Sequence, residues 1–303
     1  MSGEVMEERE ELRRLAAERQ AVILAHNYQR PEIQDVADFV GDSLELARKA
    51  AETDAKTILF CGVHFMAETA SILSPDKTVL MPDARAGCPM ANMVTAEGLR
   101  ALKAEHPQAQ VVAYVNTSAD VKAEADICCT SANAVDIVRR FPDDQPLIFV
   151  PDRNLGDYVA RQAGRDMILW QGWCHVHDDI RATDVLAQRE RHPHARVMAH
   201  PECRREVLEL ADAVLSTSGM LGWPASQDAS TFVVGTETGL LHRLGQLYPD
   251  CAFVPVKRLA YCPDMKLATL DKAIAALRDG LNEVTVPPQI RERALRAVAR
   301  MVE

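Results

Sequence analysis

A pattern that recurs about every 87 residues is the feature that most restricts the fold of this chain. The segments VILAHNY, VVAYVNT and VMAHPEC each contain a short apolar run that ends in Ala and then His or Tyr. These residues are His26, Tyr114 and His200, so the spacings are 88 and 86 residues. A fixed period of this length indicates that one structural unit is repeated along the chain.

Later features of each repeat keep the same phase. A hydroxyl residue that opens a helical pattern lies 17 residues after each His or Tyr. A second apolar run follows, and a third run ends at a cysteine 60 to 62 residues after the same His or Tyr. The hydroxyl residues are Ser43, Ser131 and Thr217. The cysteines are Cys88, Cys174 and Cys262. Chance is a poor explanation for so many features in step.

Within each repeat, apolar runs of about 4–7 residues alternate with longer helical patterns. This alternation is typical of a parallel sheet with helices on its faces. The sequence therefore predicts an α/β fold with three αβα domains, each a three-layer unit built on a parallel sheet. The domains would be related by pseudo-threefold symmetry around a central active-site cavity. The predicted domains are residues 1–86, 87–172 and 173–263, and a helical tail, 264–303, is expected to pack on the first repeat.

The charge and the hydropathy pattern exclude several classes of protein. With 34 Lys and Arg against 44 Asp and Glu, the net charge is −10, which disfavours nucleic acid and anionic membrane as partners. The N-terminal residues form an acidic amphipathic pattern rather than a secretory signal. No stretch reaches the ~18 apolar residues of a membrane span. We therefore expect a cytoplasmic protein that acts on small molecules.

Ligands of open parallel sheets bind beyond the carboxyl ends of the strands. In each repeat, unusual polar residues follow a predicted strand at this edge: 26–28, 114–116 and 200–202. The hydroxyl residues of the repeat are predicted helix N-caps, where free N–H groups and the helix dipole suit carboxylate or phosphate. Three such loops around one axis would enclose a cavity suited to a small polyanion.

The cysteines allow more than one interpretation. Thiols stay reduced in the cytoplasm, so some of the eight cysteines are expected to serve a metal or a reaction. One thiolate from each repeat suggests an iron–sulfur cluster with one open iron, which can act as a Lewis acid. The spacing also leaves open a mononuclear zinc site or thiols without metal, since the sequence has no C-x-x-C pair. The cysteines interpreted as buried or incidental are Cys61, Cys128, Cys129, Cys203 and Cys251.

Several motifs in order along the chain resemble those of a known family. They are AHNYQRPEIQDVADFVGDSLELA, DARAGCPMA, YVNTSADVKAEADICCTSANA, PDRNLG, WQGWCHVHDD, HPECRREVLELADAVLSTSGM, GTETGLLHRL and CPDMK, which span residues 21 to about 270. The family that they resemble is quinolinate synthase, an iron–sulfur enzyme of de novo NAD biosynthesis. The resemblance implies that iminoaspartate and dihydroxyacetone phosphate condense to quinolinate, phosphate and water.

The resemblance also implies a [4Fe–4S] cluster on Cys88, Cys174 and Cys262, and functional coupling to an aspartate-oxidising enzyme. The implied substrate contacts are His26, Tyr28, Ser43, Tyr114, Asn116, Ser131, His177, His200, Glu202, Ser216 and Thr217. Among them, we expect Glu202 and Tyr28 to transfer protons. We expect His26 and His200 to stabilise oxyanions or exchange protons. Ser43, Ser131, Ser216 and Thr217 are expected to bind carboxylates and phosphate.

Two other functions compete with this interpretation. A zinc hydrolase or lyase built on Cys174, His175 and His177 predicts a colourless protein that is active in air. A non-catalytic iron–sulfur sensor predicts a cluster without an enclosed polar cavity. Glu237 in GTETG remains either a strand–helix turn or a site residue.

Overall fold

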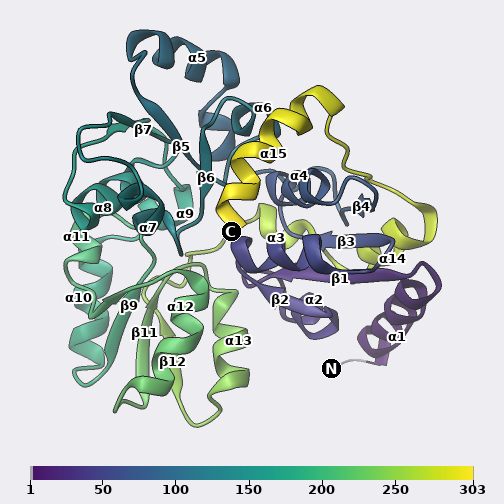
Figure 1. The fold of residues 1–303 in the computed structure, drawn as a ribbon. Coiled ribbons are helices and arrows are strands. Elements are labelled where there is room, and N and C mark those ends of the chain that lie inside the picture. Colours follow the sequence, from purple (N-terminus) through teal and green to yellow (C-terminus); the bar gives the residue numbers. More distant parts are fainter. Residues whose placement is uncertain (1–2, 303) are drawn as a thin grey trace.

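The structure is a computed structural model that describes residues 3–302, and this part of the chain contains three parallel sheets of four strands each (Figure 1). The first sheet consists of β1 (Ala21–His26), β2 (Phe39–Gly41), β3 (Thr57–Cys61) and β4 (Thr78–Leu80). The second consists of β5 (Gln110–Tyr114), β6 (Ile127–Cys129), β7 (Leu147–Val150) and β8 (Ile168–Leu169). The third consists of β9 (Arg196–Ala199), β10 (Ala213–Val214), β11 (Thr231–Gly235) and β12 (Ala252–Pro255).

The three sheets share one topology. In each, the strands lie in the order second, first, third and fourth along the chain, as in β2-β1-β3-β4. Helices flank each sheet, which confirms the predicted α/β class with three αβα units. The exact domain boundaries stay a prediction, and we use first, second and third unit for the parts built on the three sheets.

Helices connect the strands within each unit. In the first unit they are α1 (Gly3–Glu18), α2 (Pro31–Val36), α3 (Ser43–Glu52) and α4 (His64–Leu73). In the second they are α5 (Ala96–Glu105), α6 (Ala119–Lys122), α7 (Ala134–Arg139) and α8 (Arg153–Ala163). In the third they are α9 (His175–Asp178), α10 (Ala182–Arg191), α11 (Arg205–Leu208), α12 (Thr217–Gly222) and α13 (Leu240–Leu247). The tail contains α14 (Leu270–Asp279) and α15 (Pro288–Val302), and short 3-10 turns lie at Ala91–Met93, Trp223–Ser226 and Asp264–Leu267.

The strands are apolar on both faces because alternate residues enter different cores. In β1, Leu24 packs in the core that includes residues of α3 and α4. Its neighbours Ile23 and Ala25 pack on the other face, with residues of α1 and α14. This two-sided burial explains why the sequence shows continuous apolar runs instead of an alternation of apolar and polar residues.

An aspartate contact repeats in all three units and shows that they share more than their strand order. The Asp38 carboxylate accepts the Ile23 N–H at 2.8 Å. Asp126 accepts from Val111, and Asp212 from Val197, each at 2.7 Å. Each aspartate follows its partner by 15 residues and precedes the second strand of its sheet. The contact thus joins the residue that precedes the second strand to the first half of the first strand.

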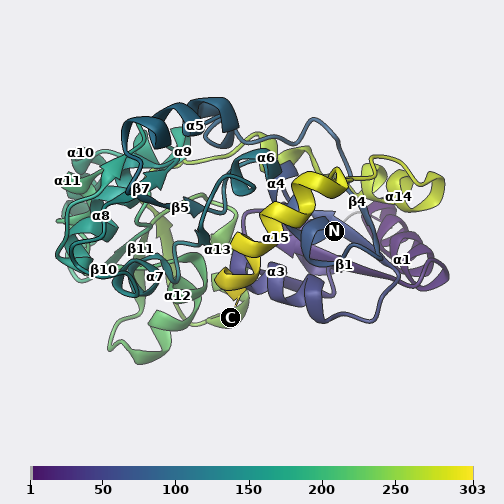
Figure 2. The same cartoon turned by 45° about the horizontal axis from the view of Figure 1, so that its top comes forward.

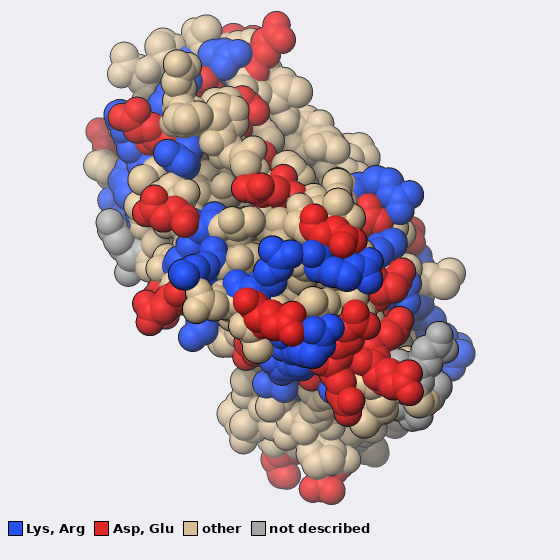
Figure 3. Space-filling model, turned by 90° about the vertical axis from the view of Figure 1, so that its right-hand side faces the viewer, with Lys and Arg blue, Asp and Glu red and all other residues tan. Residues whose placement is uncertain are grey.

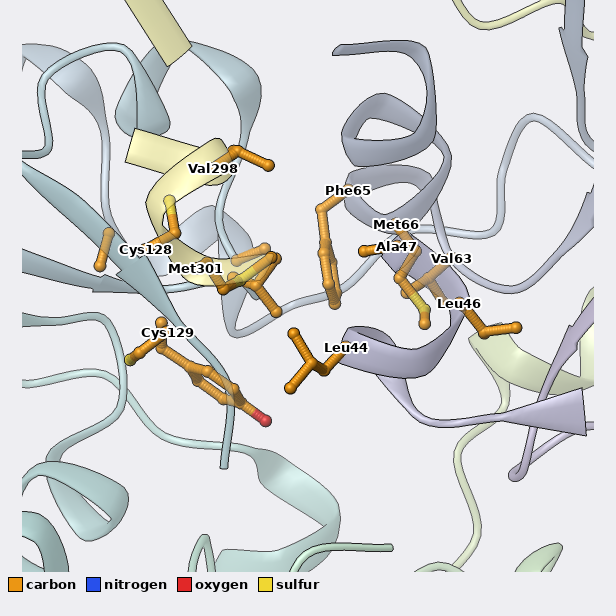
Figure 4. Close-up of a cluster of buried hydrophobic side chains, with 14 of the residues drawn as sticks. Leu44, Leu46, Ala47, Val63, Phe65, Met66, Cys128, Cys129, Val298 and Met301 are labelled. Atoms are coloured by element: carbon orange, nitrogen blue, oxygen red, sulfur yellow. The ribbon is translucent and has the colours of Figure 1, made fainter. Parts of the chain in front are cut away.

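The tail helices pack against two units. Helix α14 lies on α1 and β3 of the first unit. Helix α15 lies on α3 and α4 of the first unit and on α6 and β6 of the second, which both ribbon views show (Figures 1 and 2). Val298 and Met301 of α15 are buried among side chains of both units, including Phe65 and Cys128 (Figure 4). Helix α15 therefore braces the first unit against the second.

The outer surface carries charges of both signs. One face, which includes parts of the first unit and the tail, shows Lys and Arg interspersed with Asp and Glu (Figure 3). Ion pairs between exposed side chains, such as Arg14–Glu18 at 2.6 Å, join charges of opposite sign on the surface. Among residues 3–302, no helix has the length and apolar character that crossing a membrane requires.

Candidate functional site

Residues that follow strands of all three sheets line one cavity of about 770 Å³, a volume that includes its open mouth. The predicted site residues that line it are His26, Tyr28, Ser43, Cys88, Tyr114, Asn116, Ser131, Cys174, His177, His200, Glu202, Thr217 and Cys262. The structure thus brings together residues that are up to 236 positions apart in the chain. Ser216 is not among the lining residues, and its hydroxyl instead accepts the Gly219 N–H at 3.2 Å.

The predicted helix caps are wrong in all three units. The N-caps of α3, α7 and α12 are Asp42, Asn133 and Ser216. In α3, the Asp42 carboxylate accepts the N–H groups of Leu44 and Glu45, both at 2.9 Å, and Glu45 completes a capping box. Of the neighbours Asp42 and Ser43, Asp42 is therefore the residue that caps α3, through its carboxylate and the capping box with Glu45.

This shift of the caps changes what the hydroxyl residues can do. Ser43 and Thr217 are the first residues of their helices, and they line the cavity. Their hydroxyl groups remain available to a ligand because other residues cap the helices. The Asp42 carboxylate already lies at the N-terminus of α3, so the helix dipole there offers an added anion less than predicted.

Two histidines adopt the same turn in the first and third units. The Nδ1 atom of His26 accepts the Tyr28 N–H at 3.1 Å, and that of His200 accepts the Glu202 N–H at 3.3 Å. Since Nδ1 is an acceptor, Nε2 carries the proton of each neutral ring. Burial lowers the pKa of both imidazoles to about 3, so they are neutral near pH 7. For His200, the Nε2–H group points to the Ser131 hydroxyl at 3.2 Å.

A chain of polar contacts joins two of the predicted acid–base residues. The Tyr28 hydroxyl lies 2.6 Å from Thr236 Oγ1, which lies 2.8 Å from His177 Nε2. His177 Nδ1 in turn lies 2.7 Å from the Glu202 carboxylate. The rings of His177 and His200 stack at 4.7 Å between centroids. A proton can move between phenol and carboxylate along this chain without free water.

The ionisation of Glu202 follows from its neighbours. Burial by itself raises the pKa of this carboxyl group. The adjacent His177 and His200 and a hydrogen bond from Tyr114 oppose burial and hold its pKa below the ordinary value. Burial and the negative charge of Glu202 in turn raise the pKa of Tyr114, so Tyr114 is a neutral hydrogen-bond donor. The site therefore places the ionised Glu202 carboxylate beside the neutral phenol of Tyr114 and near the neutral imidazoles of His26 and His200.

Three half-buried cysteines, Cys88, Cys174 and Cys262, share this cavity. Burial raises the pKa of Cys88 to about 12 and that of Cys262 to about 11, and it raises the pKa of Cys174 as well. Among the other cysteines, Cys203 is fully buried in the core of the third unit and donates to the Gly235 carbonyl. Each unit thus contributes one cysteine to the cavity, and binding of a metal by these thiols would release protons.

One group of three side chains could hold a single metal ion. The ligand atoms of Cys174, His177 and Glu202 all lie within 4.8 Å of one another. His177 Nδ1 is 3.2 Å from the Cys174 sulfur and 2.7 Å from Glu202. This group shares Cys174 and His177 with the zinc alternative drawn from the sequence, with Glu202 in place of His175.

Two residues of the site, Thr236 and Asp152, were not predicted from the sequence, and a third, Glu237, was left open between a turn and a site role. Thr236, Glu237 and Asp152 come within two residues of the ends of β11 and β7. The motifs GTETG and PDRNLG contain them. Asp152 and Glu237 share one phase, two residues after the third strand of a unit, and this phase is the sequence signal that identifies these two residues. The polar site residues that the repeat predicts stand mainly at the ends of the first strands.

Comparisons with known proteins agree on one family. Residues 10–303 match a family model described as quinolinate synthetase A protein. A protein of Desulforudis audaxviator named quinolinate synthase is 54% identical over 302 residues, which cover 100% of this chain and 99% of the relative. Relatives of the same name from Methanoregula boonei and Thermodesulfovibrio yellowstonii are 54% and 50% identical, and the matches cover 97% of each chain.

Proposed function

The chain belongs to the quinolinate synthetase A protein family, and on that premise we propose that it is an enzyme of NAD biosynthesis that condenses iminoaspartate with dihydroxyacetone phosphate. One C–C bond and one C–N bond form, phosphate leaves, and two molecules of water are lost, which balances the atoms of quinolinate. The observation that carries this proposal is the single cavity that residues of all three units line. The proposal includes a cytoplasmic location and an aspartate-oxidising enzyme as the source of iminoaspartate.

The cavity supports this chemistry through its hydrogen-bond donors. Ser43, Ser131 and Thr217 bring hydroxyl groups from three different units, and Asn116 adds an amide. The neutral His26 and His200 rings each carry a proton on Nε2. These groups can bind the carboxylates of iminoaspartate and the phosphate of its partner by neutral hydrogen bonds. Ser216 supports this set indirectly by capping α12.

Glu202 and Tyr28 are the proton-transfer pair of the proposal. The ionised Glu202 carboxylate removes a proton from the carbon that forms the new bond. The Tyr28 hydroxyl protonates an oxygen that leaves as water. The contacts through His177 and Thr236 then return the proton from Glu202 to Tyr28. A relay of this kind lets one pair serve several steps.

The donor set fits a [4Fe–4S] cluster held by Cys88, Cys174 and Cys262. One thiol comes from each unit, and all three line the cavity that contains the acid–base residues. Four of the other five cysteines are buried in the cores. When bound, a cluster with three protein ligands supplies an open iron, a Lewis acid for a substrate hydroxyl or carbonyl group. The protein holds the substrates and moves their protons.

Anaerobic reconstitution of the full chain with iron and sulfide tests this proposal. The protein should become brown and should form quinolinate from iminoaspartate, generated in situ, and dihydroxyacetone phosphate. Each of Cys88→Ser, Cys174→Ser and Cys262→Ser should lose most of the cluster absorbance, while Cys251→Ser keeps it. A holoprotein that makes no quinolinate would overturn the function, and retention of the cluster in any of the three variants would overturn its ligands.

A mononuclear metal centre on Cys174, His177 and Glu202 is the second candidate, because their ligand atoms already lie within 4.8 Å of one another. The two candidates share Cys174 but make opposite predictions for the other two thiols. A single ion on this group would survive Cys88→Ser and Cys262→Ser at full stoichiometry. Metal analysis of these two variants therefore decides between the candidates.

A further inference from the structure

Two buried carboxylates occupy equivalent places in the second and third units. Asp152 lies two residues after β7, and Glu237 lies two residues after β11. Asp152 Oδ2 accepts the N–H of Cys174 at 3.2 Å, and Glu237 Oε1 accepts the N–H of Cys262 at 3.1 Å. The exposed fractions of the two carboxylate residues are 0% and 1%. The same contact thus recurs in two units and involves two of the three cavity cysteines.

Each carboxylate is also fixed by its own loop. The second oxygen of Asp152 accepts the N–H groups of Asn154 and Leu155, at 2.8 and 2.9 Å, and caps α8. The second oxygen of Glu237 accepts the Gly239 N–H at 2.7 Å. Each carboxylate therefore joins the end of a central strand to a cysteine loop 22 or 25 residues further along the chain.

Lys266 completes this arrangement in the third unit. Its ammonium group lies 3.0 Å from Glu237 Oε1 and donates to the Tyr28 carbonyl of the first unit. Because Lys266 follows Cys262 by four residues, both ends of the CPDMK segment are fastened to Glu237. A Cβ atom at Gly239 would lie 2.7 Å from the backbone carbonyl oxygen of Tyr28 and 2.7 Å from the Lys266 nitrogen, so a side chain there has no room.

We propose that Asp152 and Glu237 are positioning residues that set where the Cys174 and Cys262 thiols lie, with Lys266 holding Glu237 in place. In the first unit, the equivalent position two residues after β3 is Val63, which has no such acceptor. The proposal therefore concerns Cys174 and Cys262 and not Cys88. The inference rests on the proposed role of Cys174 and Cys262 as ligands, but the positioning itself is measurable without any cluster.

The test measures iodoacetamide alkylation of individual cysteines in the metal-free full chain by peptide mass spectrometry. Two doubly substituted chains form a matched pair: Glu237→Leu with Lys266→Met, and Glu237→Gln with Lys266→Met. Both remove the buried charges together, which proteins often tolerate, but only Gln keeps an oxygen for the Cys262 N–H. The ratio of the Cys262 rate to the Cys174 rate should rise about tenfold in the Leu chain, the worth of one hydrogen bond to a charged group. The Gln chain should return most of the way to the wild-type ratio.

Substitutions of Asp152 in the second unit should change the same ratio in the opposite direction. Asp152→Leu should release Cys174 and lower the same ratio by about tenfold, while Asp152→Asn, which keeps an oxygen, should restore most of it. Lys122→Met removes another fully buried ammonium group, which donates to the Thr117 carbonyl in the second unit, and controls for lost stability. It should leave the ratio at the wild-type value.

A second readout connects positioning to the cluster. In the reconstituted holoprotein, both Leu chains should release iron to a chelator faster than their Gln or Asn counterparts. Ratios that move in the same direction in the two arms, or that do not move in folded protein, would overturn the positioning roles. Loss of iron from Cys→Ser variants reports on the proposed function separately, so the two proposals fail in different experiments.

Discussion

At the scale of single residues, Thr236 is the link on which the proton relay depends. Its hydroxyl contacts both Tyr28 and His177, so Thr236→Val keeps the shape but breaks the chain. We expect turnover to fall by about 10²–10⁴-fold, the usual contribution of general acid–base catalysis. Thr236→Ser keeps the hydroxyl and should retain most activity. Equal turnover of the Val and Ser variants, at equal iron content, would remove Thr236 from the mechanism.

The neutral histidines predict how stability depends on pH. Burial lowers the pKa of His26 and His200 to about 3, whereas an unfolded chain titrates near 6.5. Between these values the unfolded chain binds protons that the folded chain does not, so the free energy of unfolding decreases as the pH falls from about 6.5 towards 3.

Substitution of one histidine measures how much that residue contributes to the pH dependence of the free energy of unfolding. His26→Gln should reduce the pH dependence of the free energy of unfolding by up to about 1.4 kcal/mol per pH unit within that window. His106 is exposed, so His106→Gln should leave the slope unchanged. Urea titrations of the metal-free chain at several pH values measure both slopes. A His26→Gln slope equal to that of the wild type would show that His26 is protonated in the folded chain.

At the scale of elements, we expect the aspartate contact that repeats in the three units to stabilise the first strand of each sheet. The Asp126 carboxylate accepts the Val111 N–H at 2.7 Å at the start of β5. Removing a charged acceptor leaves that N–H unpaired, so Asp126→Ala should lower the free energy of unfolding by about 1.5–3 kcal/mol. The exposed Asp54 provides a control, and Asp54→Ala should change it by less than about 0.5 kcal/mol. Similar losses in both variants would mean that the contact contributes nothing of its own.

The sequence predicted elements better than it predicted their ends. The period of the repeat places all first strands correctly, because a strand buried on both faces leaves a strong apolar run such as VVAYV. The caps failed because Asp42–Ser43 and Ser216–Thr217 each offer two residues that can cap a helix. The choice depends on which side chain reaches the N–H groups, and that is a property of the folded loop. The order of strands within a sheet likewise has no local signal.

Some residues of the candidate site could be predicted from the sequence and others could not. Residues that stand at the ends of first strands, such as His26 and Tyr114, are visible from the repeat. Thr236 was not, because its role comes from contacts with Tyr28 and His177, which lie 208 and 59 residues away. Pairings over such distances in the chain are set by the packing of the three units. No pattern within one unit reveals them.

At the scale of the whole molecule, we expect α15 to hold the first and second units together. Val298 is fully buried between them, while Leu295 on the same helix is 38% exposed. Val298→Asp should undock α15 and lower the free energy of unfolding by several kcal/mol, since it buries an unpaired charge. Leu295→Asp is the matched control and should be nearly neutral. Hydrogen exchange should show lost protection in α15 and β6 only in the first variant.

The undocking of α15 should also weaken the binding of iron by the cysteines of the cavity. The first and second units carry Cys88 and Cys174, and α15 holds these units against each other. Reconstituted Val298→Asp protein should therefore release iron faster than Leu295→Asp protein. Equal release rates, with α15 shown to be undocked, would mean that the units hold their relative positions without this helix.

The place of α15 in the chain has a consequence for biosynthesis. A ribosome completes the third unit before it makes the helix that joins the first two. Until residues 288–302 have emerged, Leu44 and Phe65 lack the apolar cover that Val298 and Met301 provide. A chain that stalls before this point therefore exposes these apolar side chains, and it lacks the helix that holds the first unit against the second.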